Sequence, residues 1–280
     1  MSRFAVIQMV SSDSIKANLA QAAELLGEAA RRGAEFALLP EFFPMMSDDE
    51  TAKVRIGEAP GAGPVQDFLA EQASVHRLWL MAGTCSLHSA ESERVYNACL
   101  LYNPEGLCTH RYDKMHLFDV QVEAEEQAVY NESNTIAPGR TSVVADTPLG
   151  RVGMTVCYDL RFPELYRELS SRQAEIFTVP AAFTYATGKR HWELLLRARA
   201  VENLCYVVAA NQGGQNTQTR RTWGHSMIVA PWGDMLCSLE EGPGVACADI
   251  DLAGMHELRR SFPALTHQVI AKPPDTGALP

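Results

Sequence analysis

The sequence predicts an α/β fold, and three features of the chain support that prediction. The chain opens with a strand, a helix and a second strand, an order that places two parallel strands beside each other under a covering helix. Short apolar runs of strand type then alternate with amphipathic helices. No linker, repeat or low-complexity tract divides the chain. We therefore predict a single domain with mixed strands over residues 1–262, followed by an extended arm over residues 263–280.

Periodicity and capping residues predict the elements of the first half. Apolar residues in the segment 15–29 recur at helical spacing, with Ser and Asp before them and Gly33 after them. A second helix follows the turn residues at Gly61–Pro64. The turn at Asn103–Gly106 joins two strands as a hairpin. The polar, acidic stretch Phe118–Pro138 lacks periodicity, and we interpret it as a long functional loop. The expected strands are Phe4–Val10, Glu35–Leu39, Leu78–Gly83, Val95–Tyr102 and a strand leading into His110–Tyr112, and the second helix covers Val65–His76.

The second half repeats the alternation of strands and helices. One helix begins near Pro163, another covers His191–Asn203, and a short last helix covers Leu252–Arg260. The polar segment Gln212–Arg221 is expected to be a loop. The turn sequence PWGD is expected to join the last two strands. The expected strands are Arg151–Val156, Ile176–Val179, Tyr206–Ala210, Ser226–Val229 and Val245–Ile250.

Composition and charge exclude several classes of protein. The 280 residues include 24 Lys+Arg and 34 Asp+Glu, a net charge of −10, and no long basic run, which argues against a nucleic-acid-binding protein. No run of about 18 apolar residues is present, as a membrane span requires. The seven cysteines are dispersed without a CxxC pair, which indicates free thiols in a reducing compartment. We therefore expect a cytoplasmic protein that contacts neither nucleic acid nor membrane.

Cys157 is the first candidate for chemistry. It directly follows an apolar strand and precedes the helix that begins near Pro163. Such a turn exposes a side chain beyond the carboxyl end of a strand and frees the next backbone N–H, that of Tyr158, for an oxyanion. A buried and inert thiol is the ordinary alternative, but the other six cysteines lack this setting.

A thiol nucleophile needs a base and an electrostatic stabiliser, and glutamate and lysine residues supply candidates for both. Glu41 follows a buried strand, and burial among apolar neighbours would raise its pKa enough for a base. Lys114 would place a fixed positive charge at a developing oxyanion, and Glu132 would hold that ammonium in place. The alternatives are a solvated helix-start residue for Glu41 and surface residues for the other two. His116 and His225 are the nearest histidines, and we interpret both as structural.

Three of these segments, in this order, resemble the motifs of the nitrilase superfamily of carbon–nitrogen hydrolases. They are LPEFF around Glu41, YDKMHLFD around Lys114 and CYDLRFPEL from Cys157. The resemblance extends over nearly the whole chain, from FAVIQM to DIDL. It implies a four-layer α-β-β-α sandwich, a Glu41–Lys114–Cys157 triad with Glu132 as a second glutamate, and no metal or organic cofactor. It also implies a homodimer or higher homo-oligomer, with the C-terminal arm crossing to the partner.

The resemblance implies an amidase reaction on a small-molecule substrate that bears a carboxylate. Glu41 would take the thiol proton of Cys157, and Lys114 with the N–H of Tyr158 would bind the oxyanion. A thioester intermediate would follow, with release of ammonia. The segments HLFDV, AAFTYATGKRHWELLLRARAVEN and GHSMIVAPWGD are most similar to the branch of deaminated glutathione amidases and omega-amidases.

The same resemblance assigns the walls of the substrate pocket to Tyr158, Phe183 and Thr184. Arg161 would bind the substrate carboxylate. An ion pair of Arg161 with Glu164 or Asp159 is an equally good interpretation of the sequence. Substrate contacts from the loop Gln212–Arg221 cannot be assigned, because QNTQTRR matches no pattern of the superfamily.

Other functions remain open at this point. The triad serves equally for an omega-amidase on α-ketoglutaramate, a nitrilase or an N-carbamoyl amino-acid hydrolase, because all need a thiol, a base and an oxyanion donor. A scaffold of the same fold without turnover is a further alternative, against which the intact triad argues. A dinucleotide-binding protein is disfavoured, since no GxGxxG follows the first strand.

Overall fold

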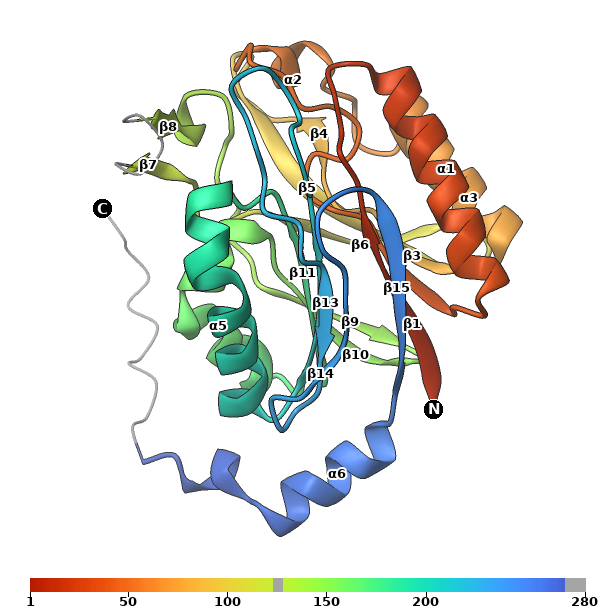
Figure 1. Ribbon diagram of the computed structural model, residues 1–280, viewed down its shortest axis with the longest axis vertical. Coiled ribbons are helices and arrows are strands. Elements are labelled where there is room, and N and C mark those ends of the chain that lie inside the picture. The colour runs from red at the N-terminus through yellow and green to blue at the C-terminus, as the bar shows by residue number, and fades with distance from the viewer. Residues whose placement is uncertain (123–127, 270–280) are drawn as a thin grey trace.

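The computed structural model describes residues 1–122 and 128–269, and its architecture is built from two mixed β-sheets packed against each other (Figure 1). Helices α1 and α3 cover the outer face of one sheet, and α4 and α5 cover the outer face of the other. The layers therefore run α-β-β-α, which confirms the predicted fold class. The helices are α1 Ile15–Arg31, α2 Ala52–Arg55, α3 Pro64–His76, α4 Pro163–Ser171, α5 Tyr185–Asn203 and α6 Leu252–Ser261.

The first sheet has seven strands in the order β15-β1-β2-β3-β5-β4, with β6 paired to β5. Strands β1, β2 and β3 are parallel, as the β-α-β opening predicts, and β15 pairs antiparallel with β1. Its strands are β1 Ser2–Gln8, β2 Phe36–Leu38, β3 Trp79–Met81, β4 Cys85–His88, β5 Val95–Tyr102, β6 Cys108–Asp113 and β15 Gly244–Ile250.

The second sheet has six strands in the order β14-β13-β12-β11-β10-β9. Its central strands β10, β11 and β12 are parallel, and the outer pairings are antiparallel. Its strands are β9 Val143–Thr147, β10 Gly150–Met154, β11 Ile176–Ala181, β12 Tyr206–Asn211, β13 Met227–Val229 and β14 Met235–Ser238.

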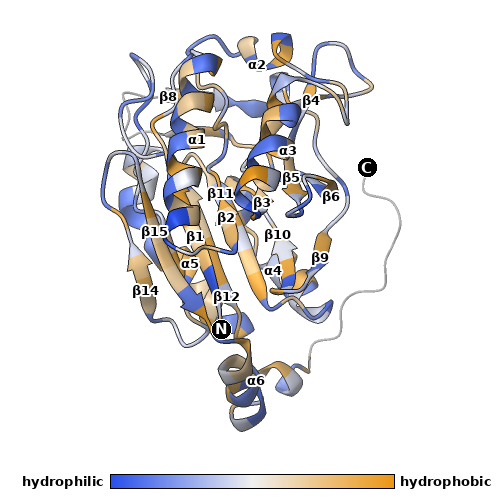
Figure 2. Cartoon of the chain, turned by 90° about the vertical axis from the view of Figure 1, so that its right-hand side faces the viewer, coloured by the Kyte–Doolittle hydropathy of each residue, from blue (hydrophilic) through white to orange (hydrophobic). Residues whose placement is uncertain are grey.

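Two apolar cores hold the layers together, and strand β1 contributes to both. Phe4 and Val6 pack into the core between the two sheets, whereas Ala5 and Ile7 pack into the core beneath α1 and α3. This alternation follows from the two-residue period of a strand with both faces covered. Figure 2 shows the resulting pattern, with largely hydrophobic interior strands and hydrophilic outward turns on α1. Within the described residues, no helix is long and apolar enough to cross a bilayer.

The segment Phe118–Pro138 differs from the expected loop. Strands β7 (Asp119–Val122) and β8 (Ala128–Asn131) pair antiparallel, and a 3-10 turn covers Glu132–Asn134. Each strand is only four residues long, too short for its alternation to stand out in the sequence. Residues 123–127 of this segment lie outside the described residues.

The end of the chain also differs from the prediction. The PWGD turn joins β13 to the unpredicted strand β14, while β15 crosses to the other sheet and pairs with β1. Helix α5 begins at Tyr185, earlier than His191, because the Thr184 side chain accepts a hydrogen bond from Thr187 N and caps the helix. The predicted extended arm contains a 3-10 turn at Ala264–His267, and residues 270–280 lie outside the described residues. Strands β4 and β9 and the short helix α2 were not predicted either.

Candidate active site

The carboxyl ends of parallel strands from both sheets meet at one place in the molecule. Glu41 follows β2 of the first sheet, and Cys157 follows β10 of the second. Ala182 and Gln212 directly follow β11 and β12. Groups beyond strand ends are held by a rigid scaffold yet stay accessible, so this edge is a favoured place for a reacting site in α/β folds.

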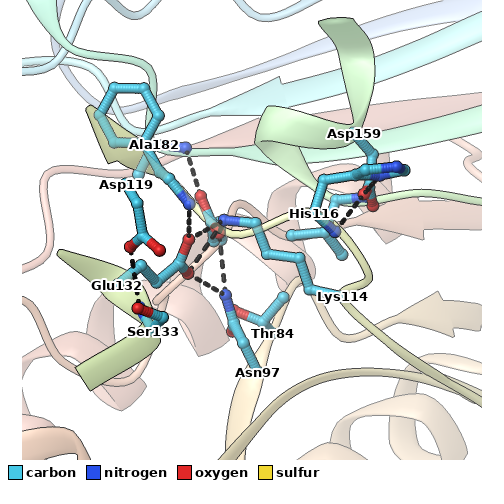
Figure 3. A network of polar contacts seen from close by, with 12 residues as sticks. Thr84, Asn97, Lys114, His116, Asp119, Glu132, Ser133, Asp159 and Ala182 are labelled. Atoms are coloured by element: carbon cyan, nitrogen blue, oxygen red, sulfur yellow. Dashed lines mark hydrogen bonds and ion pairs between the residues drawn. The ribbon is translucent and has the colours of Figure 1, made fainter. Parts of the chain in front are cut away.

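A buried cluster of charges occupies this edge (Figure 3). The ammonium of Lys114 donates to Glu41 Oε1 at 2.9 Å and to Glu132 Oε2 at 2.8 Å. Glu41, Lys114 and Glu132 are only 1%, 2% and 8% exposed. Glu41 is therefore not a solvated helix-start residue, and neither Lys114 nor Glu132 is a surface residue. The three side chains come from separate segments, and the fold brings them together as the sequence suggested.

The charges of this cluster determine which group is ready to take a proton. Burial, reinforced by the charge of Glu132, raises the pKa of Glu41 although Lys114 opposes the change. Burial on its own would lower the pKa of Lys114, but the carboxylates of Glu132 and Glu41 outweigh it and the pKa is raised. Two carboxylates thus face one ammonium, and Glu41 is the carboxylate prepared to accept a proton.

Cys157 lies against Glu41 at the start of a 3-10 turn (Cys157–Arg161). Its φ of 48° is a left-handed conformation that a non-glycine residue adopts at a cost, a strain often found at functional sites. Burial, together with the charge of Glu41 and a hydrogen bond to it, raises the pKa of the thiol. A raised pKa favours the protonated thiol, so a base such as Glu41 is needed to form the attacking thiolate.

Asp159 connects this turn to the segment that carries Lys114. Its fully buried carboxylate accepts from Val156 N at 2.8 Å, His116 N at 3.1 Å and the Tyr112 hydroxyl at 2.7 Å. The His116 ring lies 2.7 Å from the same carboxylate through Nδ1. His116 is thus structural, as expected. The His225 ring is engaged structurally as well: its Nδ1 lies 2.8 Å from Trp223 O, and it stacks on the Trp223 ring at 4.0 Å.

Backbone amides complete the cluster. Ala182 N donates to Glu41 Oε2 at 3.0 Å and also forms a hydrogen bond that lowers the pKa of the Cys157 thiol. Phe118 N donates to Glu132 Oε2 at 2.7 Å. Both glutamates therefore have fixed orientations, because each carboxylate is held by donors from more than one element.

All the site residues predicted from the sequence line a single open pocket. Aromatic and charged side chains both contribute to its walls, and the centre of the Phe118 ring lies 5.1 Å from the ring centres of both Tyr130 and Tyr158. Thr184 reaches the wall, although its hydroxyl is engaged in capping α5. The predicted residues in this lining are Glu41, Lys114, Glu132, Cys157, Tyr158, Arg161, Phe183 and Thr184.

Arg161 is held by aromatic rings rather than by a carboxylate. Its guanidinium lies 5.3 Å from the Phe183 ring centre and 5.8 Å from that of Tyr158, and it contacts His191 Nδ1 at 3.3 Å. No carboxylate of the described residues forms an ion pair with it, so the pairs with Glu164 and Asp159 are not formed. A cation stacked on aromatic faces inside a pocket suits a ligand carboxylate.

The loop Gln212–Arg221 supplies pocket residues that the sequence did not identify. Arg220 and Arg221 line the mouth of the pocket beside Lys53. Arg220 and Lys53 both form ion pairs with Glu50, and Arg221 is paired with Glu241. These contacts join segments far apart in the sequence, which is why the loop alone gave no assignment.

Buried polar residues around the charges were also missed. Asn97 on β5 donates to both glutamates, and Asp159 organises the Cys157 turn. The sequence does mark Asn97 as unusual, because this residue interrupts the apolar run VYNACLLY. A polar side chain within a buried strand needs a hydrogen-bond partner. The identity of that partner was not readable from the sequence.

Comparisons with known proteins identify the family of this chain. The family model for carbon–nitrogen hydrolases matches residues 3–260. The deaminated glutathione amidase of Yersinia enterocolitica is 39% identical, over 94% of this chain and 91% of that protein. The deaminated glutathione amidase of Synechocystis sp. is 41% identical, over 95% of this chain and 97% of that protein. The deaminated glutathione amidase of Homo sapiens is 40% identical over 94% of this chain and 81% of that protein.

Solved structures show the same fold. The C. elegans NitFhit protein superposes with a TM-score of 0.89 at 34% identity, covering 96% of this chain and 65% of that one, so this chain corresponds to part of it. Saccharomyces cerevisiae Nit3, a member of branch 10 of the nitrilase superfamily, superposes with a TM-score of 0.84 at 28% identity, over 94% of both chains. This protein therefore belongs to the carbon–nitrogen hydrolase family, within the nitrilase superfamily.

Proposed function

We propose that this chain is a cysteine-dependent amidase in which Cys157 is the nucleophile, Glu41 the base and Lys114 the oxyanion donor. The observation that carries the proposal is the buried hydrogen-bond contact of the Cys157 thiol with the Glu41 carboxylate, which also accepts from the ammonium of Lys114 at 2.9 Å. These are the three groups that acyl transfer through a thiol requires. Glu132 orients the ammonium through its two oxygens, at 3.0 and 2.8 Å.

In the proposed first half-reaction, the Cys157 thiol gives its proton to Glu41 and the sulfur attacks the amide carbonyl carbon. The C–S bond forms while the carbonyl π pair moves to oxygen, where Lys114 and the N–H of Tyr158 stabilise the negative charge. Collapse of this intermediate breaks the C–N bond. Glu41 returns the proton to the leaving nitrogen, and the acyl group stays on sulfur as a thioester.

In the second half-reaction, water attacks the thioester while Glu41 accepts one of its protons. The oxyanion forms again at Lys114, and its collapse breaks the C–S bond. The proton on Glu41 then returns to the sulfur, which restores the thiol of Cys157 and the carboxylate of Glu41. The chain's own residues supply every proton transfer in this scheme.

We further propose deaminated glutathione, or a similar amide with an acyl carboxylate, as the substrate. Arg161 fits that carboxylate, and the amidases that share about two fifths of this sequence carry this name. Tyr158 and Phe183 would flank the acyl chain. Deaminated glutathione is a secondary amide, so its leaving group would be cysteinylglycine. The expected release of ammonia applies only to primary amides such as α-ketoglutaramate.

The test is a substrate panel with the purified chain. Deaminated glutathione and α-ketoglutaramate are assayed for 2-oxoglutarate, the acyl product common to both, together with the released amine or ammonia. We expect faster turnover of deaminated glutathione and loss of turnover in Cys157→Ala. A Cys108→Ala variant is the matched control, since Cys108 is an exposed free thiol on β6.

Each contrary outcome of this panel has a distinct meaning. Preference for α-ketoglutaramate would make the enzyme an omega-amidase, and turnover of a nitrile or carbamoyl compound alone would replace the substrate class. Retained activity in Cys157→Ala would overturn the nucleophile. If the chain turns over no substrate and Cys157 does not react with iodoacetamide, a scaffold without catalysis is favoured.

We infer a homodimer from one exposed apolar surface. Leu194 and Val201 on the outer face of α5 lie beside Trp232 in the β13–β14 turn, and Arg197 Nε binds Gly233 O at 3.0 Å to join the two elements. Leu194 is 67% and Trp232 56% exposed. An apolar surface of this kind fits a self-complementary contact with a second copy.

We also propose that residues 1–262 act as one domain, with residues 263–280 as an arm. Support comes from the antiparallel pairing, within the first sheet, of β15, late in the chain, with β1 at its start. Helix α6 is attached through Arg259, whose guanidinium donates to Leu204 O and Ala174 O. A cytoplasmic location, with neither nucleic acid nor membrane as partner, stays a prediction from composition.

A further inference from the structure

Asn97 directs its side-chain amide at the charge cluster without taking part in the proposed chemistry (Figure 3). Its side-chain nitrogen donates to Glu41 Oε1 at 2.9 Å and approaches Glu132 Oε1 at 3.5 Å. Its backbone carbonyl accepts from Lys114 N at 3.1 Å. One buried residue of β5 therefore contacts the base, the second glutamate and the main chain of the lysine.

The carboxylates of Glu41 and Glu132 fix which way the side-chain amide of Asn97 points, and this orientation costs a hydrogen bond on the other side of the amide. Its oxygen Oδ1 is buried and has no hydrogen-bond partner among the described residues. The reversed orientation would place that oxygen against two carboxylates, and oxygen lone pairs repel each other. The observed orientation thus leaves one acceptor unsatisfied in exchange for donors to Glu41 and Glu132.

The two oxygens of Glu41 consequently have different surroundings. Oε1 accepts from both Asn97 and Lys114, each at 2.9 Å. Oε2 accepts from Ala182 N at 3.0 Å, and the same amide forms a hydrogen bond to Cys157. Oε2 is therefore the oxygen on the thiol side, and Oε1 is occupied on the lysine side.

We propose that Asn97 is a positioning residue that occupies Glu41 Oε1, so that Glu41 exchanges its proton with Cys157 through Oε2. This inference rests on the proposed amidase function. A proton on Oε1 would displace a donor and would lie away from the sulfur. Donors to a carboxylate also favour its charged form, so Asn97 keeps Glu41 available as a base to lower pH.

Besides Asn97, three charged or titratable groups of the described residues surround Glu41 and influence its pH dependence. Lys114 approaches from the end of β6, Glu132 from the turn after β8 and Cys157 from the turn after β10. Asn97→Leu leaves the charges of all three groups in place and removes only the hydrogen bonds that Asn97 donates to Glu41 and Glu132. A change in pH dependence therefore reports on the hydrogen bonds that Asn97 donates.

The experiment compares Asn97→Leu and Asn97→Asp with Asn203→Leu. Asn203 is a matched control because it is also fully buried and its Oδ1 has no hydrogen-bond partner within residues 1–122 and 128–269. It lies at the end of α5, where it donates to Arg199 O. Two quantities are measured against pH: kcat/KM for the amide substrate, and the rate of iodoacetamide alkylation at Cys157 followed by mass spectrometry. Thermal unfolding is recorded for each variant.

In Asn97→Leu we expect the acid limb of both profiles to move upward by about one pH unit, since one donor to the carboxylate is lost. Below the limb, kcat/KM should fall about tenfold, the loss of charged Glu41 that one unit implies. Asn97→Asp should shift the acid limb further upward, because a third carboxyl group then faces the carboxylates of Glu41 and Glu132. Asn203→Leu should lower the unfolding temperature and leave both profiles in place.

An unchanged acid limb in the Asn97 variants, or an equal shift in Asn203→Leu, would overturn the inference and leave Asn97 a structural residue. Asn97→Asp preserves side-chain size and supplies the result if Asn97→Leu does not fold. The alkylation profile needs no substrate. A shifted alkylation profile in a protein that hydrolyses no amide would therefore reject the proposed function while retaining the link from Asn97 to Glu41 and Cys157.

Discussion

At the scale of residues, the site consists of charges that are stable only together. Glu41, Lys114 and Glu132 are nearly inaccessible to water, and an isolated buried charge is strongly disfavoured. Burial is the main cause of the raised pKa of Glu41, and the charge of Glu132 adds to it while Lys114 opposes it. Stability and proposed reactivity thus come from the same contacts.

Arg161 allows the substrate assignment to be tested at this scale. We expect Arg161→Met to raise KM for a substrate with an acyl carboxylate by roughly 10- to 100-fold, the effect of losing one hydrogen bond to a charged group. The value of kcat should change little, because Arg161 would hold the substrate equally in the ground and transition states. Steady-state kinetics provides both numbers.

Two controls accompany the Arg161 measurement. Arg197→Met removes a cation from the outer face of α5, where Arg197 pairs with Glu193, and should leave KM unchanged. An amide without the carboxylate should have the same KM with Arg161→Met as with the unaltered chain. If the carboxylate-bearing substrate also keeps its KM, Arg161 does not bind it.

At the scale of elements, the loop after β2 has its path set by a neighbouring glycine. Gly83 adopts φ +58°, and a Cβ added there would overlap the carbonyl oxygen of Pro40, directly before Glu41. The Glu41 carbonyl is held as well, by Gln212 Nε2 at 3.1 Å. The loop that carries Glu41 is therefore positioned through its main chain, by close approach to Gly83 and by the hydrogen bond from the Gln212 side chain.

The glycine leads to a prediction with a matched control. Gly83→Ala should reduce the free energy of unfolding by more than about 1 kcal/mol and lower kcat, because strain adds to a displaced Pro40–Glu41 segment. Gly33→Ala has similar strain, at φ +80°, but nothing lies within 4 Å of its Cβ. Gly33→Ala should therefore lose about 1 kcal/mol of stability with kcat intact. Denaturant unfolding and kinetics measure both, and equal kcat values in the two variants would contradict the explanation.

At the scale of the whole molecule, the outer helical layers differ in their exposed apolar residues. The α5 side presents Leu194, Val201 and Trp232 together, and the Trp232 ring also contacts Phe262 at 5.3 Å. The α3 side presents Val75, which is 66% exposed. A second copy is therefore expected on the α5 layer.

The dimer prediction is tested by adding a charge to each layer. Leu194→Glu should convert a dimer into a monomer, because a carboxylate would be buried at the contact without a partner. Val75→Glu places the same charge on an equally exposed residue of α3 and should leave the dimer intact. Light scattering after size exclusion gives the masses. A monomer in the unaltered chain, or dissociation by Val75→Glu alone, would reject the α5 surface.

The sequence by itself determined the fold class and the residues of the proposed triad. Strands and helices were readable because periodicity and caps are local properties, and Glu41, Lys114 and Cys157 were identified from their short surrounding segments. The short strands β7, β8 and β14 were not readable, since four residues carry too little alternation.

Only the tertiary structure decided which groups touch. It placed β15 beside β1 and brought Asn97, Ala182 and Gln212 to Glu41 from distant parts of the chain. It also left Arg161 against aromatic rings, although acidic residues stand near it in sequence. The physical reason is that burial, hydrogen-bond pairing and the resulting pKa changes depend on distances in space, which chain separation does not encode.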